Sequence, residues 1–242
     1  VVSFIRGILE RDARTRGANP AKAGSRRNKS RVIKVGHGGT LDPLASGVLV
    51  IGVGKGTKEL QTYLNGPKVY RARGELGFET TTLDMEGNVT KRAPFDHVTR
   101  STVEEVLLAF TGKIQQMPPI FSAIRKDGKR LHEEARKGKT IEDIGIQPRS
   151  VEVLRIDLLD FQLPKFDLEV ECGGGTYIRA IIRDIGYKVQ SVATTTFLER
   201  TQQGQFKLDG ALAKDDWTVD NIYSKIKRIN ALREEEKSEP EA

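Results

Sequence analysis

FDLEVECGGGTYIRAIIRDIG, residues 166–186, joins a strand pattern directly to a helix pattern and so indicates how this chain folds. Apolar and acidic residues alternate over 166–172, which is the period of a half-buried strand. Three glycines at 173–175 then break the strand, and isoleucines recur at helical spacing until Gly186, where we expect the helix to end. The stretch therefore predicts a strand that leads into an amphipathic helix.

Further segments carry one of the same two patterns. Residues 70–78 alternate like a strand, and 47–53 (GVLVIGV) form a short apolar run that indicates a buried strand. Ser101-x-x-Glu104 is a capping box, so we expect a helix over 102–111. Because strands and helices are interspersed without a regular βαβ repeat, the sequence predicts an α+β fold with a largely antiparallel or mixed sheet.

Two weaker local signals complete the expected secondary structure. Thr57 has the side chain of a helix cap and precedes a short apolar pattern, so we expect it to cap a short helix. Residues 11–30 lack apolar periodicity, and we expect them to form an exposed loop after a short N-terminal helix.

Length and composition are those of an ordinary globular protein. The 242 residues correspond to between one and two domains at a prior of about 150 residues each. Hydrophobic residues make up 37% and charged residues 30% of the chain. No run approaches the roughly 18 apolar residues of a membrane helix, so we expect no membrane partner. The single cysteine cannot form an internal disulfide, which favours a reducing compartment.

The charge balance favours a polyanionic partner. Forty Lys and Arg against 33 Asp and Glu leave a net charge of +7, as is common in nucleic-acid-binding proteins. Two stretches are strongly basic, RRNKSRVIK at 26–34 and residues 125–139. Each could contact phosphates or simply be a solvated surface, and the residues alone favour the surface. The final stretch, 233–242, is acidic and is expected to fray.

Several patterns resemble reactive sites but lack a feature that such a site requires. GVGKGT at 52–57 lacks the Lys-Ser/Thr pair of a phosphate-binding P-loop. Cys172 falls on the apolar side of its predicted strand, where a free cysteine is usually a core residue. The three histidines are far apart and have no partner at metal-ligand spacing, so we expect no metal site.

The sharpest candidate site lies in VGHGGTLDPLASG, residues 35–47. Asp42, held between a glycine-rich bend and Pro43, could act as a nucleophile or a base. It could equally be an ordinary turn residue, which composition and spacing alone favour. Arg179, near the start of the predicted helix, could pair with a carboxylate or a phosphate, or lie on the surface.

A resemblance to a known family covers most of the chain. GHGGTLDPLASGVLVIGVGKGTK (36–58) closely resembles the catalytic motif of TruB-type tRNA pseudouridine synthases, in the form found in the eukaryotic branch. Four further segments resemble later motifs of the family in the same order, at 68–87, 115–138, 172–186 and 195–206. The resemblance implies the pseudouridine synthase fold, with a mixed, mostly antiparallel central sheet, flanking helices and a thumb insertion at about 115–150.

The resemblance also implies an activity. Members of the family isomerise the uridine at position 55 in the T-loop of tRNA. The N1–C1′ bond breaks, the base turns, and it is rejoined to the sugar through C5. The base must leave its stack for this to occur, which costs a few kcal/mol. No cofactor is implied. The expected partner is the tRNA T-arm, with messenger RNA hairpins that mimic it as a further possibility. We expect a monomer located in the nucleus or the mitochondrion, and a tRNA chaperone of the same fold is the alternative function.

Specific residues inherit roles from the matched motifs. Asp42 corresponds to the nucleophile that attacks C1′, Tyr70 to the aromatic residue that stacks on the base, and Arg179 to the partner that orients Asp42. Either Tyr70 or Asp42 would remove the sugar proton. Further contacts to the flipped base or its surroundings are implied for His37, Tyr177, Leu198 and Asp84. RNA contacts in the thumb are implied for Arg125, Lys126, Lys129 and Arg130.

Two departures from the family pattern concern the ends of the chain. The family normally opens with a Lys-Pro-x-Gly-x-x-Ser segment, whose Lys and Pro have no counterpart before Val1. Only about 36 residues follow the last motif, which is too few for the PUA domain of bacterial relatives. We therefore expect one catalytic domain over 1–232, a frayed tail over 233–242 and no PUA domain.

Overall fold

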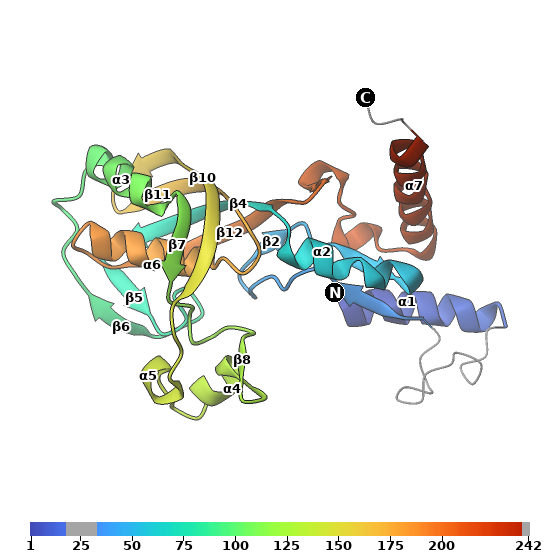
Figure 1. The fold of residues 1–242 in the computed structure, drawn as a ribbon, viewed down its shortest axis with the longest axis horizontal. Helices are drawn as coiled ribbons and strands as arrows, with labels where there is room; N and C mark the ends of the chain where they lie inside the picture. Colours follow the sequence, from blue (N-terminus) through green and yellow to red (C-terminus); the bar gives the residue numbers. More distant parts are fainter. Residues whose placement is uncertain (18–32, 239–242) are drawn as a thin grey trace. The chain divides into compact units, whose positions relative to one another are not determined.

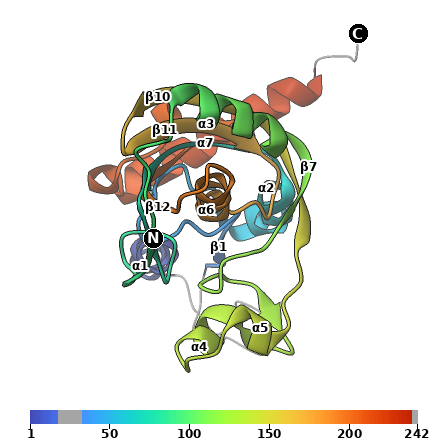
Figure 2. The ribbon, with the colours of Figure 1, turned by 90° about the vertical axis from the view of Figure 1, so that its left-hand side faces the viewer.

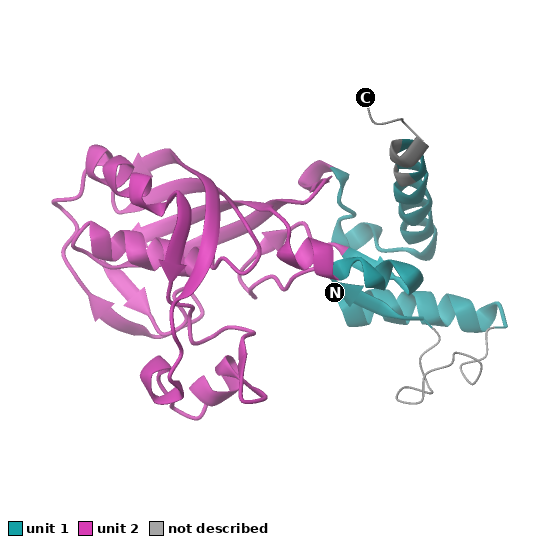
Figure 3. Ribbon diagram, in the orientation of Figure 1, with its two compact units in different colours: residues 1–37, 51–60, 210–242 teal, residues 38–50, 61–209 magenta. Residues whose placement is uncertain are grey.

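The structure, a computed structural model, describes residues 1–17 and 33–238. The basic stretch 26–34 therefore lies outside the described residues except for its last two positions. The chain divides into two compact units, one formed by 1–37, 51–60 and 210–242, the other by 38–50 and 61–209 (Figure 3). The range 1–232 that we expect to form one catalytic domain spans both units, which are called unit 1 and unit 2 below.

Unit 2 is built on a seven-stranded sheet with the order β13-β12-β4-β11-β10-β7, in which β2 pairs with β12 (Figure 1). All pairs are antiparallel except β2 with β12, so the expected mixed, mostly antiparallel sheet is confirmed. The strands are β2 (Ser46–Gly47), β4 (Lys68–Leu76), β7 (Gly112–Gln116), β10 (Arg149–Gln162), β11 (Lys165–Cys172), β12 (Ala193–Gln203) and β13 (Phe206–Lys207).

Alternation in the sequence sets which face of this sheet is buried. In β4 and β11 every second residue is buried, and Tyr70 pairs with Val170 as Ala72 pairs with Leu168. These inward side chains meet helix α6 (Ile178–Lys188), which lies in the concavity of the curved sheet (Figure 2). The predicted strand at 166–172 is therefore confirmed. The predicted strand at 70–78 is confirmed only as far as Leu76, because Gly77 has a φ of 97° and Phe78 begins a strand of another sheet. Cys172 is a core residue whose burial raises its pKa to about 11.

Helix α6 differs from expectation at its end. It continues past Gly186 to Lys188. A Cβ on Gly186 would lie 2.5 Å from the backbone nitrogen of Ala193, the first residue of β12. The glycine is therefore required by the close approach of helix and strand, and the prediction that it ends the helix was wrong.

Three other local predictions need correction. Helix α3 (Arg100–Leu107) is capped by Thr99, whose hydroxyl accepts a hydrogen bond from the Thr102 amide, so Ser101 lies inside the helix. Thr57 caps no α-helix, because it lies in the 3₁₀ helix η2 (Gly54–Lys58) and donates back to the Gly54 carbonyl. The run GVLVIGV forms no single strand, since Gly47 adopts a left-handed φ of 101° and the chain passes from β2 to β3 (Ile51–Val53).

The remaining elements of unit 2 include a thumb insertion between β7 and β10, which matches the expected position. It contains β8 (Arg125–Lys126), β9 (Lys129–Arg130), α4 (Leu131–Ala135) and α5 (Ile141–Ile144). Elsewhere in the unit are α2 (Leu60–Asn65, whose first residue belongs to unit 1), the hairpin β5 (Phe78–Thr80) with β6 (Val89–Arg92), and η3 (Leu108–Phe110). Helix α3 packs against β10 and α6, so it also contributes to the core.

Unit 1 joins two helices to a short hairpin. It contains α1 (Val2–Thr15), β1 (Val35–His37) paired with β3, η2, η5 (Lys214–Asp216) and α7 (Val219–Ser238), while η4 (Leu208–Gly210) leads into it. Its own small core gathers Ile5, Leu9, Val35 and Ile222. None of the described helices is both long enough and apolar enough to cross a membrane.

Two predictions of irregular structure concern unit 1. The first is wrong in part, since residues 11–15 continue helix α1, where Arg16 extends the last turn with a 2.9 Å ion pair to Asp12. Helix α7 extends to Ser238, and the expected fraying of 233–242 stays a prediction. Residues 239–242 lie outside the described part of the chain.

Candidate active site

Asp42 lies on a loop of unit 2, residues 38–50, at the first position of a tight turn. The Ala45 amide donates to the Asp42 carbonyl at 2.9 Å, and Pro43 occupies the second position, where its fixed φ suits the turn. The expected turn is therefore present, and it leaves the carboxylate side chain 28% exposed.

Arg179 grips this carboxylate from the first turn of α6. Its Nε and Nη2 each donate to one oxygen of Asp42, both at 2.7 Å, which is a side-on bidentate pair. Two backbone carbonyls take further donors of the same guanidinium, at Thr82 (2.6 Å) and Phe121 (3.1 Å). The Arg179 side chain is only 3% exposed, so the structure resolves the alternatives of the sequence: Arg179 is a buried partner of a carboxylate.

Asp84 faces the same guanidinium from another side. Its Oδ2 lies 3.3 Å from Nη1 of Arg179, and its side chain is 2% exposed. Its Oδ1 accepts from the Thr82 hydroxyl at 2.5 Å and from the Glu86 amide at 3.1 Å. Four hydrogen bonds and the ion pair with Asp84 thus surround the Arg179 guanidinium, so the orientation of Asp42 is fixed by a side chain that cannot easily turn.

Tyr70 points from β4 toward the buried side of the sheet, where it is 9% exposed. Burial is the main cause that raises the pKa of its phenol, and the positive charge of Arg200 opposes the rise. The negative charge of Asp42 contributes to the same shift, so the two groups lie within electrostatic reach of each other. Tyr70 is accordingly a buried aromatic side chain whose phenol favours its neutral form.

Tyr177 and Leu198 lie in the same part of unit 2. Tyr177 immediately precedes α6, and both its amide and its carbonyl are held by the side chain of Gln116, at 2.8 and 3.1 Å. Burial raises the pKa of Tyr177, with a smaller contribution from Asp42 in the same direction. Leu198 is buried in the core cluster that contains Tyr70. The predicted residues Asp42, Arg179, Asp84, Tyr70, Tyr177 and Leu198 therefore occur together in unit 2, while their roles stay predictions.

His37 is placed differently from the other predicted site residues. It ends β1 in unit 1, opposite Ile51, with an exposed side chain. Its proposed contact with RNA stays a prediction.

The thumb residues separate into two groups that the sequence could not distinguish. Arg125, Lys129 and Arg130 are exposed on the β8–β9 hairpin. Lys126 instead donates to the carbonyls of Ile144 and Gly145, which are the C-terminal end of α5. Lys126 is therefore a structural residue here, and its predicted phosphate contact would compete with these bonds.

Sequence reasoning missed a buried polar group next to Tyr70. Lys68 is 5% exposed and donates to the carbonyls of Leu64 and Gly66 at 2.7 and 2.6 Å. Burial, followed by the neighbouring charge of Arg200, lowers its pKa to about 8. Arg200 and Gln203 are buried as well. The sequence did contain a signal for the burial of Arg200. It lies two residues after Leu198, and in a strand these two residues share a face.

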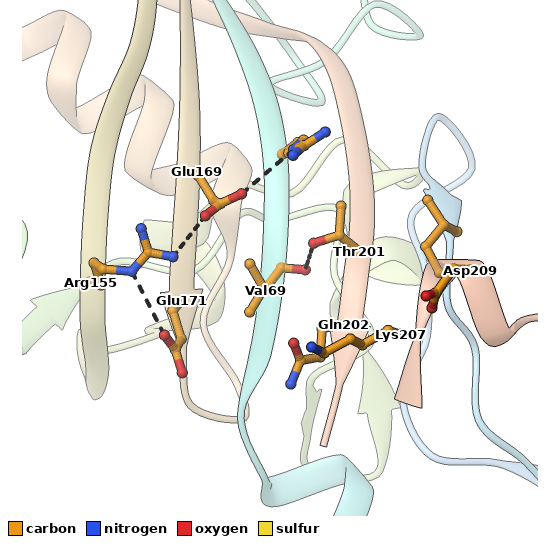
Figure 4. Close-up of a pocket in the computed structure, with 10 residues that line it drawn as sticks. Val69, Arg155, Glu169, Glu171, Thr201, Gln202, Lys207 and Asp209 are labelled. Atoms are coloured by element: carbon orange, nitrogen blue, oxygen red, sulfur yellow. Dashed lines mark hydrogen bonds and ion pairs between the residues drawn. The ribbon is translucent and has the colours of Figure 1, made fainter. Parts of the chain in front are cut away.

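A hollow of about 650 Å³ lies on the opposite face of the same sheet, and Asp42 does not line it. Several of its charged residues pair with one another: Arg155 pairs with Glu169 at 2.7 Å and Glu171 at 3.9 Å (Figure 4). The Thr201 hydroxyl is likewise used, by the carbonyl of Val69. Because none of Asp42, Arg179 and Tyr70 lines the hollow, the candidate site is the cluster around Asp42.

Potential metal ligands do not cluster among the described residues. The described residues contain no group of three His, Cys, Asp or Glu side chains that could hold a metal ion. The acidic side chains closest to the site, Asp42 and Asp84, are both directed at Arg179. The cluster is suited to nucleophilic or acid–base chemistry by a carboxylate.

Comparison with known proteins relates this chain to a family. Residues 27–178 match the sequence model of the TruB family pseudouridylate synthase N-terminal domain. Pseudouridylate synthase TRUB1 of Mus musculus is 48% identical over 90% of this chain and 64% of the mouse protein. Its Homo sapiens counterpart is 46% identical over 89% of the chain and 63% of the human protein. The chain thus spans less than two thirds of both mammalian relatives.

Bacterial relatives and solved structures extend the comparison. tRNA pseudouridine synthase B of Bacteroides fragilis is 44% identical over 77% of this chain and 79% of the bacterial protein. A crystal structure of a Cbf5–Nop10–Gar1 complex contains a chain of similar fold, with a TM-score of 0.56, 30% identity, and coverage of 76% of this chain and 44% of that chain. This protein belongs to the TruB family of pseudouridine synthases.

Proposed function

We propose that this protein converts uridine to pseudouridine in tRNA, at position 55 of the T-loop. The observation that carries the proposal is the bidentate pair between Asp42 and the buried Arg179, at 2.7 Å for both bonds. The names of the mammalian and bacterial relatives support a pseudouridine synthase, and the bacterial name supports tRNA as the substrate.

The pair supplies what an isomerisation at C1′ requires. A carboxylate with two oxygens fixed by a fork of donors cannot rotate away, so one oxygen can be presented to the sugar in a constant orientation. Asp42 attacks C1′ as the N1–C1′ bond breaks, and the detached uracil turns. When C5 bonds to C1′, the bond between C1′ and the Asp42 oxygen breaks and frees the carboxylate. C5 then loses its proton, and N1 of the product gains one. The reaction is therefore balanced without a redox partner.

The surroundings of Asp42 suit a base removed from its stack. Extrusion of a nucleotide costs a few kcal/mol, and a loop nucleotide costs less than a paired one. Stacking on an aromatic ring returns about 1–3 kcal/mol, and Tyr70 is the buried aromatic residue within the electrostatic reach of Asp42 on β4. If the reaction passes through removal of a sugar proton, Tyr70 and Asp42 are the two candidate bases.

The thumb contributes positive charge for the RNA backbone. Arg125 faces Arg130 across the β8–β9 pair. Like charges placed opposite each other on a hairpin are destabilising by themselves, and a bound polyanion relieves that repulsion. This arrangement favours phosphate contact over a merely solvated surface.

The rival function, a tRNA chaperone that binds and releases the T-arm, has no use for the Asp42–Arg179 pair. The deciding experiment incubates T-arm RNA with the wild type and with Asp42→Ala, then quantifies pseudouridine by mass spectrometry of the digested RNA. We expect product from the wild type and none from the variant, with RNA affinity retained in both. Equal product from the two proteins would remove Asp42 from the chemistry. Binding without product from the wild type would favour the chaperone.

Position 55 is tested in the same assay. A T-arm RNA in which the uridine at that position is replaced by cytidine should yield no pseudouridine, while its affinity for the protein changes little. Pseudouridine formed elsewhere in the substituted arm would contradict the assigned position and leave the synthase activity standing.

A further inference from the structure

Strand β12 buries two polar side chains that the chemistry above does not use. Arg200 is 1% exposed and Gln203 is fully buried. No ion pair among the described residues joins Arg200 to a carboxylate, although a buried charge is costly unless it is compensated. Its compensation must therefore come from neutral acceptors, and these identify what the residue holds.

Arg200 holds both arms of the loop that carries Asp42. Its Nε donates to the Val48 carbonyl at 2.7 Å, and its Nη2 donates to the Gly39 carbonyl at 3.2 Å. The Val48 amide in turn donates to the backbone carbonyl of Arg200 at 2.7 Å. Gly39 precedes Asp42 and Val48 follows it, so a single guanidinium ties the two ends of the catalytic turn to the sheet.

Gln203 makes a second connection between the same two arms. Its Nε2 donates to the Gly38 carbonyl at 2.7 Å, while its Oε1 accepts from the Val50 amide at 3.2 Å. The Gly38 amide also donates directly to the Val50 carbonyl at 2.9 Å. The two ends of the loop are therefore joined by a backbone hydrogen bond between Gly38 and Val50 and by the side chain of Gln203, which bonds to the same two residues.

A bulge in β12 makes this pair of contacts possible. Residues three apart in a regular strand point to opposite faces. Here Arg200 pairs with Tyr70 and Gln203 pairs with Lys68, so two residues of β12 oppose the one residue Val69 between them. The additional residue returns Gln203 to the face of Arg200. Thr201 and Gln202 accordingly lie at the hollow on the other face (Figure 4).

A glycine in the loop allows the loop backbone to approach Arg200 closely. Gly47 adopts a φ of 101°, and a Cβ at this position would lie 2.3 Å from the carbonyl oxygen of Arg200. On the far side of the guanidinium, Nη1 lies 3.4 Å from the phenolic oxygen of Tyr70. Arg200 thus contacts the loop of the proposed nucleophile and the ring of the proposed stacking residue together.

We infer that Arg200 and Gln203 are positioning residues that set the distance between Asp42 and the base held on Tyr70. The effect on catalysis rests on the proposed function. The effect on the loop that carries Asp42 rests only on the contacts of Arg200 and Gln203. A lysine at position 200 would keep the positive charge but could not reach Val48, Gly39 and Tyr70 with one planar group.

The test compares Arg200→Lys and Gln203→Met with the wild type in single-turnover assays on T-arm RNA. We expect Arg200→Lys to slow the chemical step by about 10²-fold, as a displacement of about 1 Å does, with a smaller loss for Gln203→Met. Because neither residue is proposed to touch RNA, the Kd for T-arm RNA should stay within twofold of the wild type, about 0.4 kcal/mol. Leu107→Ala, a core truncation in α3, is the control for general loss of stability.

Amide hydrogen exchange measures the clamp without reference to activity. In both variants the amides of Gly38, Val48 and Val50 should exchange faster, while those of α3 and β10 do not. Leu107→Ala should show the reverse. The inference is overturned if exchange in 38–50 and the single-turnover rate both match those of Leu107→Ala. If the wild type makes no pseudouridine, the proposed function fails, and the exchange data still decide whether β12 clamps the loop.

Discussion

Unit 2 contains two arginine–carboxylate clusters on opposite sides of one sheet, and they differ in burial. On the inner side Arg179, 3% exposed, lies between Asp42 and Asp84. On the outer side Arg155, 46% exposed, contacts Asp157, Glu169 and Glu171. The chemical groups are the same. Water screens the outer cluster, whose pairs are each worth about 0–1 kcal/mol, whereas breaking a buried pair costs about 3–5 kcal/mol. Burial, more than the number of ion pairs, distinguishes a site from a surface.

The largest expected effect breaks the inner cluster at its arginine. Arg179→Lys keeps the charge but cannot present two parallel donors to Asp42, so we expect turnover to fall about 10²-fold and the melting temperature to decrease. The matched outer variant, Arg155→Lys, should change neither quantity measurably. Single-turnover assays and calorimetry check both variants. Equal losses from the two would show that burial is not what separates the clusters.

A smaller effect is expected at the second inner carboxylate. Asp84→Asn would direct an amide N–H₂ at Nη1 of Arg179, where two donors would then face each other at the present 3.3 Å. An unsatisfied buried donor costs about 1–3 kcal/mol, so denaturant unfolding should show a loss in this range. Glu169→Gln on the outer face should be near neutral. A loss confined to Glu169→Gln would reverse the comparison.

The thumb offers a third kind of charge, exposed and without a carboxylate opposite. Arg125→Glu combined with Arg130→Glu should weaken T-arm binding and reduce the slope of log K against log salt, by about 0.7 for each single-strand phosphate that the thumb no longer neutralises. The control is Lys165→Glu combined with Lys188→Glu, which changes net charge equally on exposed positions outside the thumb. Equal weakening by the control would mean that net charge alone governs affinity. Lys126 is left unchanged because it supports α5.

A pH-dependent effect is expected at the buried Lys68. Since its pKa falls from the ordinary 10.5 of a lysine to about 8, the unfolded chain holds a proton between these values that the folded chain has released. The contribution of this group to the free energy of unfolding therefore rises as pH increases from about 8 to about 10.5, and is constant below that window. Denaturant titrations from pH 7 to 10 should show this rise in the wild type and not in Lys68→Met. The exposed Lys165→Met should keep it.

The parts of the fold that sequence predicts are those governed by local periodicity. The strands at 70–76 and 166–172 alternate, and the isoleucines of α6 recur at helical spacing, so each element follows from its own residues. Predictions failed where a distant contact decides the outcome. Gly186 lies inside a helix because β12 passes against it, and the run at 47–53 divides because its two halves pair with different strands.

The site divides in the same way. Asp42 and Arg179 could be proposed from the motifs they occupy, and the structure joins them by two hydrogen bonds across 137 positions of sequence. The family resemblance implies an RNA contact for Lys126. Its structural role could not be predicted, because its carbonyl partners lie 18 and 19 residues away and leave no local pattern. Arg200 and Gln203 escaped notice because a strand read with a period of two places them on opposite faces, and only pairing with β4 reveals the bulge.

That bulge makes this segment sensitive to chain length as well as to composition. Loss of both Thr201 and Gln202 would remove no charge and no core side chain, yet Gln203 would then follow Arg200 directly. Because neighbouring residues of a strand point to opposite faces, its amide would turn to the outer face of the sheet. Of the two side chains that connect the arms of the loop carrying Asp42, only Arg200 would then remain in place. A deletion of these two codons would resemble a change at the surface of the sheet, yet it would displace Asp42, with RNA still bound and the sugar out of reach.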